Sequence, residues 1–292
     1  MEKTLRKPLT LKHYLLLMKP GIILGNLLTT AGGYALAARG QFDLGIFLSM
    51  MQGLALIIAS ACVFNNYIDR NHDAKMNRTK YRALARGIIP HRKALLFGIS
   101  LGFLGTFILA VGTNPLTTYV ALTGFFFYVI VYSLSKYQTT YGTLIGSIAG
   151  AIPPVVGYTT VTHTLDLGAF ILFAIITMWQ MPHFFAIAIY RLSDYTKASI
   201  PVFPCVKGVQ KTKIHMIAYL LAFIMATALM TLCGYTTITF MIIMASLGIC
   251  WLILALKGFS AKNDVRWARK MFIFSLIVVT ILSVALPFTT VS

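Results

Sequence analysis

The sequence is short of acidic residues and of charge in general. Only seven of its 292 residues are Asp or Glu, and charged types make up 11% of the chain, whereas a soluble domain usually carries about a quarter. Its four cysteines are scattered, with no Cys-x-x-Cys pair and no histidine at metal spacing, which argues against a disulfide framework or a structural zinc site. The chain therefore lacks the surface chemistry of a soluble globular protein.

Long apolar runs take the place of that polar surface. Hydrophobic types make up 58% of the residues, and runs of about 20 apolar residues, the length of a membrane-spanning helix, recur along nearly the whole chain. The runs are continuous rather than alternating, which favours helices over a β-barrel. We predict an all-α membrane protein with a single polytopic domain over residues 1–292. The nine predicted spans cover residues 20–38, 44–64, 94–112, 116–134, 142–161, 168–189, 214–233, 236–256 and 271–289.

The fifth predicted span carries two signals of its own. Gly142, Gly146 and Gly150 are spaced by four, which is typical of close helix packing in membranes. Pro153 and Pro154 predict an interruption of the helix near the outer end of this span.

The basic residues predict the orientation in the membrane. Nine spans place every Lys and Arg except Arg39 on the side of the N-terminus. Because cytoplasmic loops retain positive charge, we expect a multi-pass protein of the bacterial inner (cytoplasmic) membrane with a cytoplasmic N-terminus. The formal net charge of +18 is then topological, and no nucleic acid partner is predicted. No removable signal peptide is expected, since the basic N-terminal segment lacks a small-residue cleavage site. That segment contributes Lys3, Arg6, Lys7, Lys12 and Lys19.

Two cytoplasmic loops, 65–93 and 190–213, are the substantial polar segments between spans, so the functional site is expected there. In the first, Asn65, Asp69 and Asp73 are spaced by four and would share one face of a helix. Two carboxylates on one stripe repel each other unless a cation lies between them, and such oxygen ligands suit Mg²⁺. The alternative is a solvated amphipathic helix end.

Basic side chains accompany these carboxylates. Arg78 and Arg82 follow the stripe at a spacing of four, and guanidinium groups bind phosphate oxygens in pairs. Lys136 is the single cation after the fourth span, and Arg191 and Asp194 follow the sixth. Carboxylates beside arginines indicate Mg²⁺ and diphosphate chemistry. Membrane anchoring of the cations and a local Arg191–Asp194 ion pair remain the alternatives.

Polar groups inside spans are costly and are therefore candidates for function. Asn26 in the first span and His183 in the sixth stand out, and Trp179 shares a helical face with His183. Pro182 should bend that helix. A satisfied core histidine is the alternative for His183.

These patterns resemble the intramembrane aromatic prenyltransferase superfamily, over nearly the whole chain. The resemblance rests on the Asn-x-x-x-Asp-x-x-x-Asp stripe, the Arg-Thr-x-x-Arg that follows it and the acidic motif after span six. It implies nine helices around a central cavity that opens to the cytoplasmic side. Within the superfamily the branch that prenylates haem is the closer match. Its segments here begin at Lys19-Pro20-Gly21, Cys62-Val63-Phe64, Tyr141-Gly142-Thr143, Trp179-Gln180-Met181-Pro182-His183-Phe184 and Asp194-Tyr195.

The resemblance implies transfer of a farnesyl group from farnesyl diphosphate to a vinyl group of haem B, with Mg²⁺ as the cofactor. It implies Asn65, Asp69 and Asp73 as metal ligands, with Asp194 as a less certain helper. Diphosphate contacts fall to Arg78, Arg82, Lys136 and Arg191, and haem or substrate contacts to Asn26, Tyr132, Trp179 and His183. Ligation of the haem iron by His183 stays open. One departure from the superfamily is Ala198, which stands where many members carry a second carboxylate.

The other partners expected are membrane lipid and either a haem A synthase or a terminal oxidase that receives the product. Three alternatives remain. Another acceptor, such as 4-hydroxybenzoate, would keep the fold and the Mg²⁺ site. A transporter would place its charges at mid-depth, whereas these carboxylates gather at span ends. A membrane assembly factor without catalysis is the third.

Overall fold

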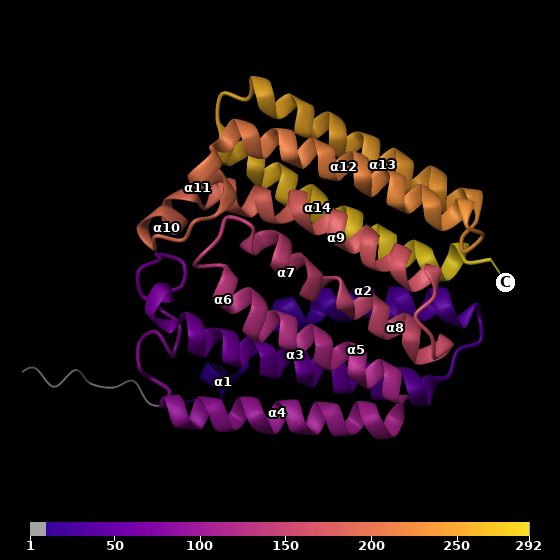
Figure 1. The fold of residues 1–292 in the computed structure, drawn as a ribbon, viewed down its shortest axis with the longest axis horizontal. Helices are drawn as coiled ribbons and strands as arrows, with labels where there is room; N and C mark the ends of the chain where they lie inside the picture. The colour runs from indigo at the N-terminus through magenta and orange to yellow at the C-terminus, as the bar shows by residue number, and fades with distance from the viewer. Residues whose placement is uncertain (1–9, 292) are drawn as a thin grey trace, which may run out of the picture.

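The computed structural model describes residues 10–291, and these are almost entirely helical (Figure 1). In that range nine helices or joined helices are long and apolar enough to cross a membrane, as predicted. The helical segments are α1 (Leu11–Leu17), α2 (Pro20–Ala38), α3 (Leu44–Asp73), α4 (His91–Gly112), α5 (Pro115–Phe126), the π-helix η1 (Phe127–Tyr132), α6 (Ser133–Ser135), α7 (Gly142–Gly150), α8 (Ile152–Thr162), α9 (Leu167–Tyr190), α10 (Leu192–Lys197), α11 (Phe203–Lys207), α12 (Val209–Leu232), α13 (Ile238–Leu256), the 3₁₀-helix η2 (Lys257–Ser260) and α14 (Asp264–Thr289).

The long helices lie side by side with roughly parallel axes. In Figure 1, α12 and α13 form one edge of the bundle, α4 forms the other, and α9 and α14 lie between them. The closest pairs include α3 with α4, α2 with α8 and α12 with α9. The loop after α3 and the short helices α10 and α11 gather at one end of the bundle, which therefore carries both predicted functional segments.

The predicted loop 65–93 is wrong in its first part. Helix α3 continues through the polar motif to Asp73, past residue 64 where the second span was predicted to end, and the predicted helical placement of Asn65, Asp69 and Asp73 is confirmed. The helix continues because its polar side chains find partners inside the protein. Asn66, for example, is buried and donates from Nδ2 to the carbonyl oxygen of Leu17 at 2.8 Å. The loop proper begins at Ala74.

The second predicted loop, 190–213, also contains helices. It holds α10 and α11, and α12 begins at Val209 instead of residue 214. The short helix α1 lies ahead of the first span. The sequence pattern did not predict it, because a helix of 7 residues is too short to show a hydrophobic periodicity. The N-terminal residues Lys3, Arg6 and Lys7, which were assigned to the cytoplasmic side, lie outside the described residues.

The interruption of the fifth span is confirmed, although its position is not. Helices α7 and α8 meet at Ala151, in the middle of the span, because Pro153 and Pro154 start α8 in its first turn, where proline is tolerated. Helix α9, by contrast, continues through Pro182 to Tyr190. The central cavity, its cytoplasmic opening and a bend at Pro182 stay predictions.

Candidate active site

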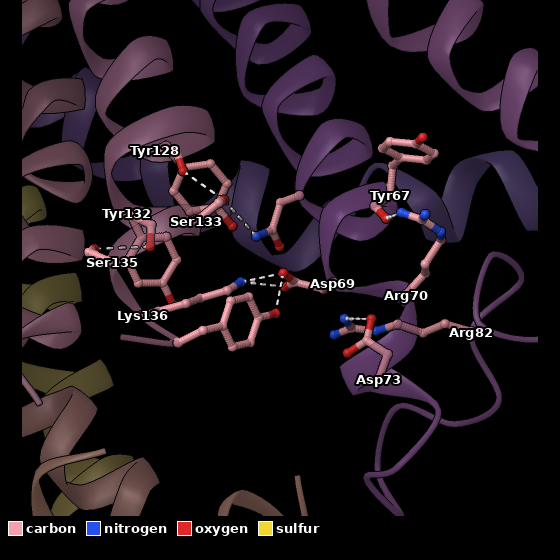
Figure 2. Close-up of polar contacts among 12 residues, drawn as sticks. Tyr67, Asp69, Arg70, Asp73, Arg82, Tyr128, Tyr132, Ser133, Ser135 and Lys136 are labelled. Atoms are coloured by element: carbon pink, nitrogen blue, oxygen red, sulfur yellow. Dashed lines mark hydrogen bonds and ion pairs between the residues drawn. The ribbon is translucent and has the colours of Figure 1, made fainter. Parts of the chain in front are cut away.

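The carboxylate of Asp69 is the centre of a polar cluster at the end of α3 (Figure 2). Lys136 Nζ lies 2.5 Å from Oδ1 and 2.6 Å from Oδ2 of Asp69, and the Tyr137 hydroxyl donates to Oδ1 at 2.7 Å. Asp69 itself is 8% exposed. The ring of Tyr137 is held in place by His72, which stacks on it at 3.9 Å between centroids. A residue from the end of the fourth span thus neutralises a buried charge on the second.

Asp73 has a cation of its own. Arg82 NH1 contacts Asp73 Oδ2 at 2.7 Å, and the backbone oxygen of Asp73 accepts from the Thr79 hydroxyl at 3.0 Å. Asp73 is 2% exposed and the Arg82 side chain is 29% exposed, so the ion pair joins a buried carboxylate to a guanidinium that reaches the protein surface. Removing one partner of a buried pair leaves an uncompensated charge, which is more costly than the pair is stabilising. The loop after α3 is therefore tied back onto the stripe.

Asn65, the third residue of the stripe on α3, also has a basic partner. Lys19 Nζ donates to Asn65 Oδ1 at 2.6 Å, and burial lowers the pKa of Lys19 to about 8. Lys19 caps α2 with φ 54° and ψ 66°, a left-handed conformation that is costly for a residue that has a Cβ and precedes a proline. Helix α1 fixes this turn, since Leu17 binds Asn66. Such strain persists where the surroundings determine it, commonly at functional sites.

The fourth span carries its part of the site on a π-helix. Segment η1 runs from Phe127 to Tyr132, and such π-helices often occur at functional sites. The rings of Tyr128 and Tyr132 stack at 5.5 Å, and Lys136 Nζ lies 5.1 Å from the Tyr132 centroid. The Ser133 hydroxyl, which donates to Tyr128 O at 3.1 Å, lies 3.5 Å from Asn65 Nδ2. Tyr132 thus stands beside the cation that binds Asp69.

The glycine stripe of α7 explains how these side chains fit. A Cβ on Gly142 would lie 2.7 Å from Lys136 Cα, and one on Gly146 would lie 2.9 Å from the Tyr132 ring. Both distances are too short for real side chains. The close packing predicted from the glycine spacing is confirmed. It lets α7 lie directly against Tyr132 and Lys136, the residues at the end of the fourth span that lie near Asp69.

The acidic residue of the second loop faces the first loop. Asp194 Oδ1 accepts the backbone N–H of Asn77 at 3.3 Å, and Asp194 is buried. Burial raises the pKa of the neighbouring Tyr195, while the positive charges of Arg78 and Arg191 act to lower it. Arg191 stacks over Tyr190 at 5.2 Å and forms no ion pair with Asp194 among the described residues, so that predicted alternative is not what the structure places there.

The predicted haem contacts are divided between two places. Trp179 and His183 stack at 4.9 Å inside α9, where both contact Ser275 of α14. Asn26 lies on α2 and donates to Ile22 O one turn earlier at 2.7 Å. The charged cluster thus gathers Asn65, Asp69, Asp73, Arg82, Lys136 and Tyr132, while Trp179 and His183 form a separate aromatic cluster.

The oxygen donors of Asn65, Asp69 and Asp73, all on α3, suit a hard cation such as Mg²⁺, and the basic side chains beside them suit a diphosphate. Across residues 10–291, no three Asp, Glu, His or Cys side chains are placed to share one ion. The oxygens of Asn65, Asp69 and Asp73 are instead each held by one basic side chain. Nε of Arg191 is fully buried with no hydrogen-bond partner in the described chain, as a group awaiting an anion would be. The mutual repulsion predicted for Asp69 and Asp73 is thus relieved by two separate cations.

The sequence pattern missed several contributors. Lys19 was assigned to membrane anchoring, and Tyr137, His72 and Ser275 were not singled out. One signal was available for Lys19, because Pro20 directly follows it at the start of a span. No sequence pattern marks Tyr137 or Ser275, since their partners lie 68 and 92 residues away along the chain.

Comparison with known proteins agrees with this geometry. The UbiA prenyltransferase family model matches residues 26–277. Relatives named protoheme IX farnesyltransferase include one from Protochlamydia amoebophila, 50% identical over 97% of this chain and 100% of that protein. Another, from Yersinia enterocolitica, is 50% identical over 94% of this chain and 93% of that protein.

Solved structures share the fold at low identity. One, from work on digeranylgeranylglyceryl phosphate synthase, has a TM-score of 0.78 at 18% identity and covers 95% of this chain and 97% of its own. A UbiA homolog from Archaeoglobus fulgidus bound to DMAPP and Mg²⁺ has a TM-score of 0.69 at 18% identity, covering 94% and 99%. From the family match and the near-complete relatives together, the chain belongs to the UbiA prenyltransferase family.

Proposed function

We propose that this chain transfers the farnesyl group of farnesyl diphosphate to a vinyl group of protohaem IX (haem B) and so produces haem O. The observation that carries this proposal is the 50% identity, over nearly the full length, to relatives named protoheme IX farnesyltransferase. The buried carboxylates among cations at the end of α3 support the diphosphate half of the reaction. A transporter or a non-catalytic assembly factor has no such support.

Asn65, Asp69 and Asp73 would hold Mg²⁺, with Asp194 as an additional carboxylate from the second loop. The Archaeoglobus fulgidus homolog was solved with a prenyl diphosphate and Mg²⁺, which supports the same cofactor here. When bound, the ion neutralises the diphosphate and makes it a better leaving group. Lys136 and Arg82 pair with Asp69 and Asp73, and Lys19 binds Asn65. Arg78 and Arg191 act on Tyr195, the neighbour of Asp194, and complete a set of five basic side chains. This positive excess matches a trianionic diphosphate.

The basic partners of Asn65, Asp69 and Asp73 suggest how the site is loaded. Lys19, Lys136 and Arg82 occupy the oxygens that the metal would take. Asn65, Asp69 and Asp73 would turn to Mg²⁺ when it is bound, and Lys19, Lys136 and Arg82 would then be free to bind phosphate oxygens. Because the cations stand ready before the substrate arrives, they need little reorganisation to stabilise the developing negative charge of the leaving group.

The covalent step then needs no base to activate the acceptor. The terminal carbon of a haem vinyl group bonds to C1 of the farnesyl chain as the C1–O bond breaks, and the bonding electron pair leaves with diphosphate. The positive charge that remains on the inner vinyl carbon is captured by water, which loses one proton. The product is a haem with a hydroxyethylfarnesyl group. The farnesyl tail would lie among the helices, in contact with membrane lipid.

Location and orientation follow from the charge pattern. The loop after α3 and helices α10 and α11 lie at one end of the bundle, and both segments are rich in Lys and Arg. This distribution supports a multi-pass protein of the bacterial inner membrane with the site and the N-terminus on the cytoplasmic side. The central cavity would open there. The hydrophobic product would pass to a haem A synthase or a terminal oxidase.

Expression of the chain in a bacterium without this activity tests the proposal. Extracted haems should include a new, more hydrophobic haem on reversed-phase chromatography. It should be absent from cells that express Asp69→Asn at equal membrane abundance. If the chain instead prenylates 4-hydroxybenzoate and leaves haem B unchanged, the fold and the Mg²⁺ site stand and the acceptor is wrong.

A further inference from the structure

A neutral polar cluster lies inside the bundle where α9 packs against α14. His183 Nδ1 lies 2.7 Å from the Ser275 hydroxyl oxygen, and Trp179 Nε1 donates to the backbone oxygen of Ser275 at 2.8 Å. Two side chains one turn apart on α9 therefore bind the same residue of α14. This double contact fixes the orientation of both rings.

Ser275 has a single hydroxyl hydrogen, and its use determines the tautomer of His183. Ser275 Oγ lies 2.5 Å from the carbonyl oxygen of Phe272, which can only accept a hydrogen bond. The hydroxyl hydrogen therefore goes to Phe272. Nδ1 of His183 must then donate its own hydrogen to Ser275 Oγ, because two acceptors would repel each other at 2.7 Å. The neutral imidazole consequently keeps a free lone pair on Nε2.

That second nitrogen has no partner among residues 10–291. No hydrogen bond there involves Nε2 of His183, and Nε2 is not one of the fully buried polar atoms that lack a partner. His183 as a whole is 9% exposed. The free lone pair therefore reaches the small open part of an otherwise buried side chain.

Aromatic rings surround the imidazole on its other sides. Trp179 stacks on it at 4.9 Å with an interplanar angle of 26°, and Phe184 and Phe272 lie at 5.3 and 5.0 Å between centroids. A core histidine with both nitrogens satisfied would offer no free lone pair, whereas Nε2 of His183 has no partner among the described residues and is not fully buried. Flat apolar walls beside a free nitrogen suit a flat apolar ligand that carries a metal ion.

We propose that Nε2 of His183 is an axial ligand of the iron of the haem acceptor, and that Ser275 is the positioning residue that holds His183 in the ligating tautomer. This inference rests on the proposed function and specifies how the same site holds its second substrate. A metal-ligating histidine usually donates its other N–H to an oxygen, which fixes the ring and raises its basicity. A proximal histidine is also a common iron ligand of haem.

The position of His183 along α9 is compatible with both substrates being bound at once. His183 precedes Arg191 by eight residues, a rise of roughly 12 Å along an α-helix. The iron would therefore be held deeper in the bundle than the phosphate-binding cations. Ligation at the iron fixes the position of the porphyrin edge that carries the vinyl group.

The test is resonance Raman spectroscopy of ferrous haem bound to the full chain in detergent. The wild-type chain should show an iron–histidine stretching band. His183→Ala should lose that band and weaken haem binding at least about tenfold, and added imidazole should restore a ligated spectrum. His215→Ala removes an exposed histidine from α12 and should change neither property. His183→Gln provides a second variant in case the alanine chain does not fold.

Ser275 has variants that separate tautomer control from simple packing. Ser275→Ala should shift the iron–histidine band and weaken haem binding by about tenfold, because Nδ1 loses its acceptor. Ser275→Thr retains the hydroxyl and should resemble the wild type. A band that is unchanged in Ser275→Ala contradicts the positioning role.

The inference and the proposed function fail in different ways. A wild-type chain that takes up no haem would overturn the proposed acceptor. A wild-type chain that binds and farnesylates haem, while His183→Ala keeps the same spectrum and affinity, would overturn only the ligation by His183.

Discussion

The two halves of the site hold their side chains by different physical means. Around Asp69 and Asp73, Lys136 and Arg82 form ion pairs at 2.5 and 2.7 Å, and Lys19 and Tyr137 add hydrogen bonds at 2.6 and 2.7 Å. Around His183, two helices meet through neutral hydrogen bonds and stacked rings. Under the proposed function, an ion and a diphosphate would exchange the partners of the first arrangement. In the second, the hydrogen bonds to Ser275 fix both rings and leave Nε2 of His183 without a partner among the described residues.

The charged contacts and the neutral contacts differ in how much they are expected to contribute to the stability of the fold. A buried ion pair is weak evidence for stability, because desolvation offsets the attraction between the charges. Under the proposed function the charged half would bind Mg²⁺ and diphosphate, and it should therefore respond to charge substitution, pH and metal. The aromatic half should be insensitive to all three. Changes to the charged half should therefore leave haem binding as it is in the wild type.

The largest effect is expected from Asp69→Asn. Loss of this carboxylate leaves Lys136 without its partner and removes a metal ligand, so haem farnesylation should fall roughly a thousandfold or more, while haem binding is retained. The measurement is the initial rate of product formation by purified protein. Asp43→Asn is the matched control, since Asp43 caps the other end of the same helix and Asn caps equally well. Farnesylation at near-normal rates by Asp69→Asn would remove the basis for the metal site.

A smaller effect is expected from Lys19→Asn. Asn tolerates the left-handed conformation of Lys19 but carries no charge, so it tests the charge rather than the turn. The KM for farnesyl diphosphate should rise about tenfold, a typical worth for one charge-assisted hydrogen bond. The KM for haem should not change. The control is Lys12→Asn, on the exposed face of α1. If only the KM for haem changed in Lys19→Asn, the assignment of Lys19 to diphosphate binding would be wrong.

The lowered pKa of Lys19 predicts that kcat/KM for farnesyl diphosphate depends on pH. Burial lowers the pKa of Lys19 to about 8, so the amine loses its charge as the pH rises through that value. The kcat/KM for farnesyl diphosphate should therefore be constant below about pH 8 and decline above it. In Lys19→Arg this decline should vanish, because guanidinium stays charged over the whole range. An identical decline in that variant would assign the titration to another group.

The smallest effect is expected from Tyr137→Phe. Burial raises the pKa of Tyr137, so its hydroxyl stays protonated and donates to Asp69. One neutral donor is worth about 1 kcal/mol, hence the turnover should fall roughly threefold to tenfold. Tyr141→Phe, an exposed neighbour in the same segment, should behave as wild type. A loss as large as that of Asp69→Asn would make the phenol part of the chemistry itself.

The sequence predicted the parts of this protein that depend on local pattern. Nine spans, the four-residue spacing of Asn65, Asp69 and Asp73, and the packing role of Gly142 and Gly146 all follow from periodicity and composition. The ends of α3 and α12 were predicted poorly, since polar residues in a span-end helix resemble a loop when their partners are unknown. The contacts of Asp69 with Lys136 and Tyr137 depend on tertiary structure, which no local pattern encodes.

For the aromatic half, too, the sequence predicted which residues lie together but not how their side chains are oriented. Trp179 and His183 were singled out because they share a helical face, but their orientation depends on Ser275, an unremarkable residue of the last span. The predicted tautomer follows only once the carbonyl of Phe272 is placed beside that hydroxyl. The tautomer of His183 therefore depends on tertiary contacts that sequence spacing does not contain.

The most direct test of the account combines purified chain, farnesyl diphosphate and haem B, with mass spectrometry of the extracted haem. With Mg²⁺ present, the haem should gain one farnesyl group and one hydroxyl group, with release of one diphosphate and one proton per haem. With the metal chelated, product should be absent while the haem spectrum of the protein is unchanged. Product formation that is indifferent to chelation, or haem that returns unmodified in the presence of Mg²⁺, would contradict the account.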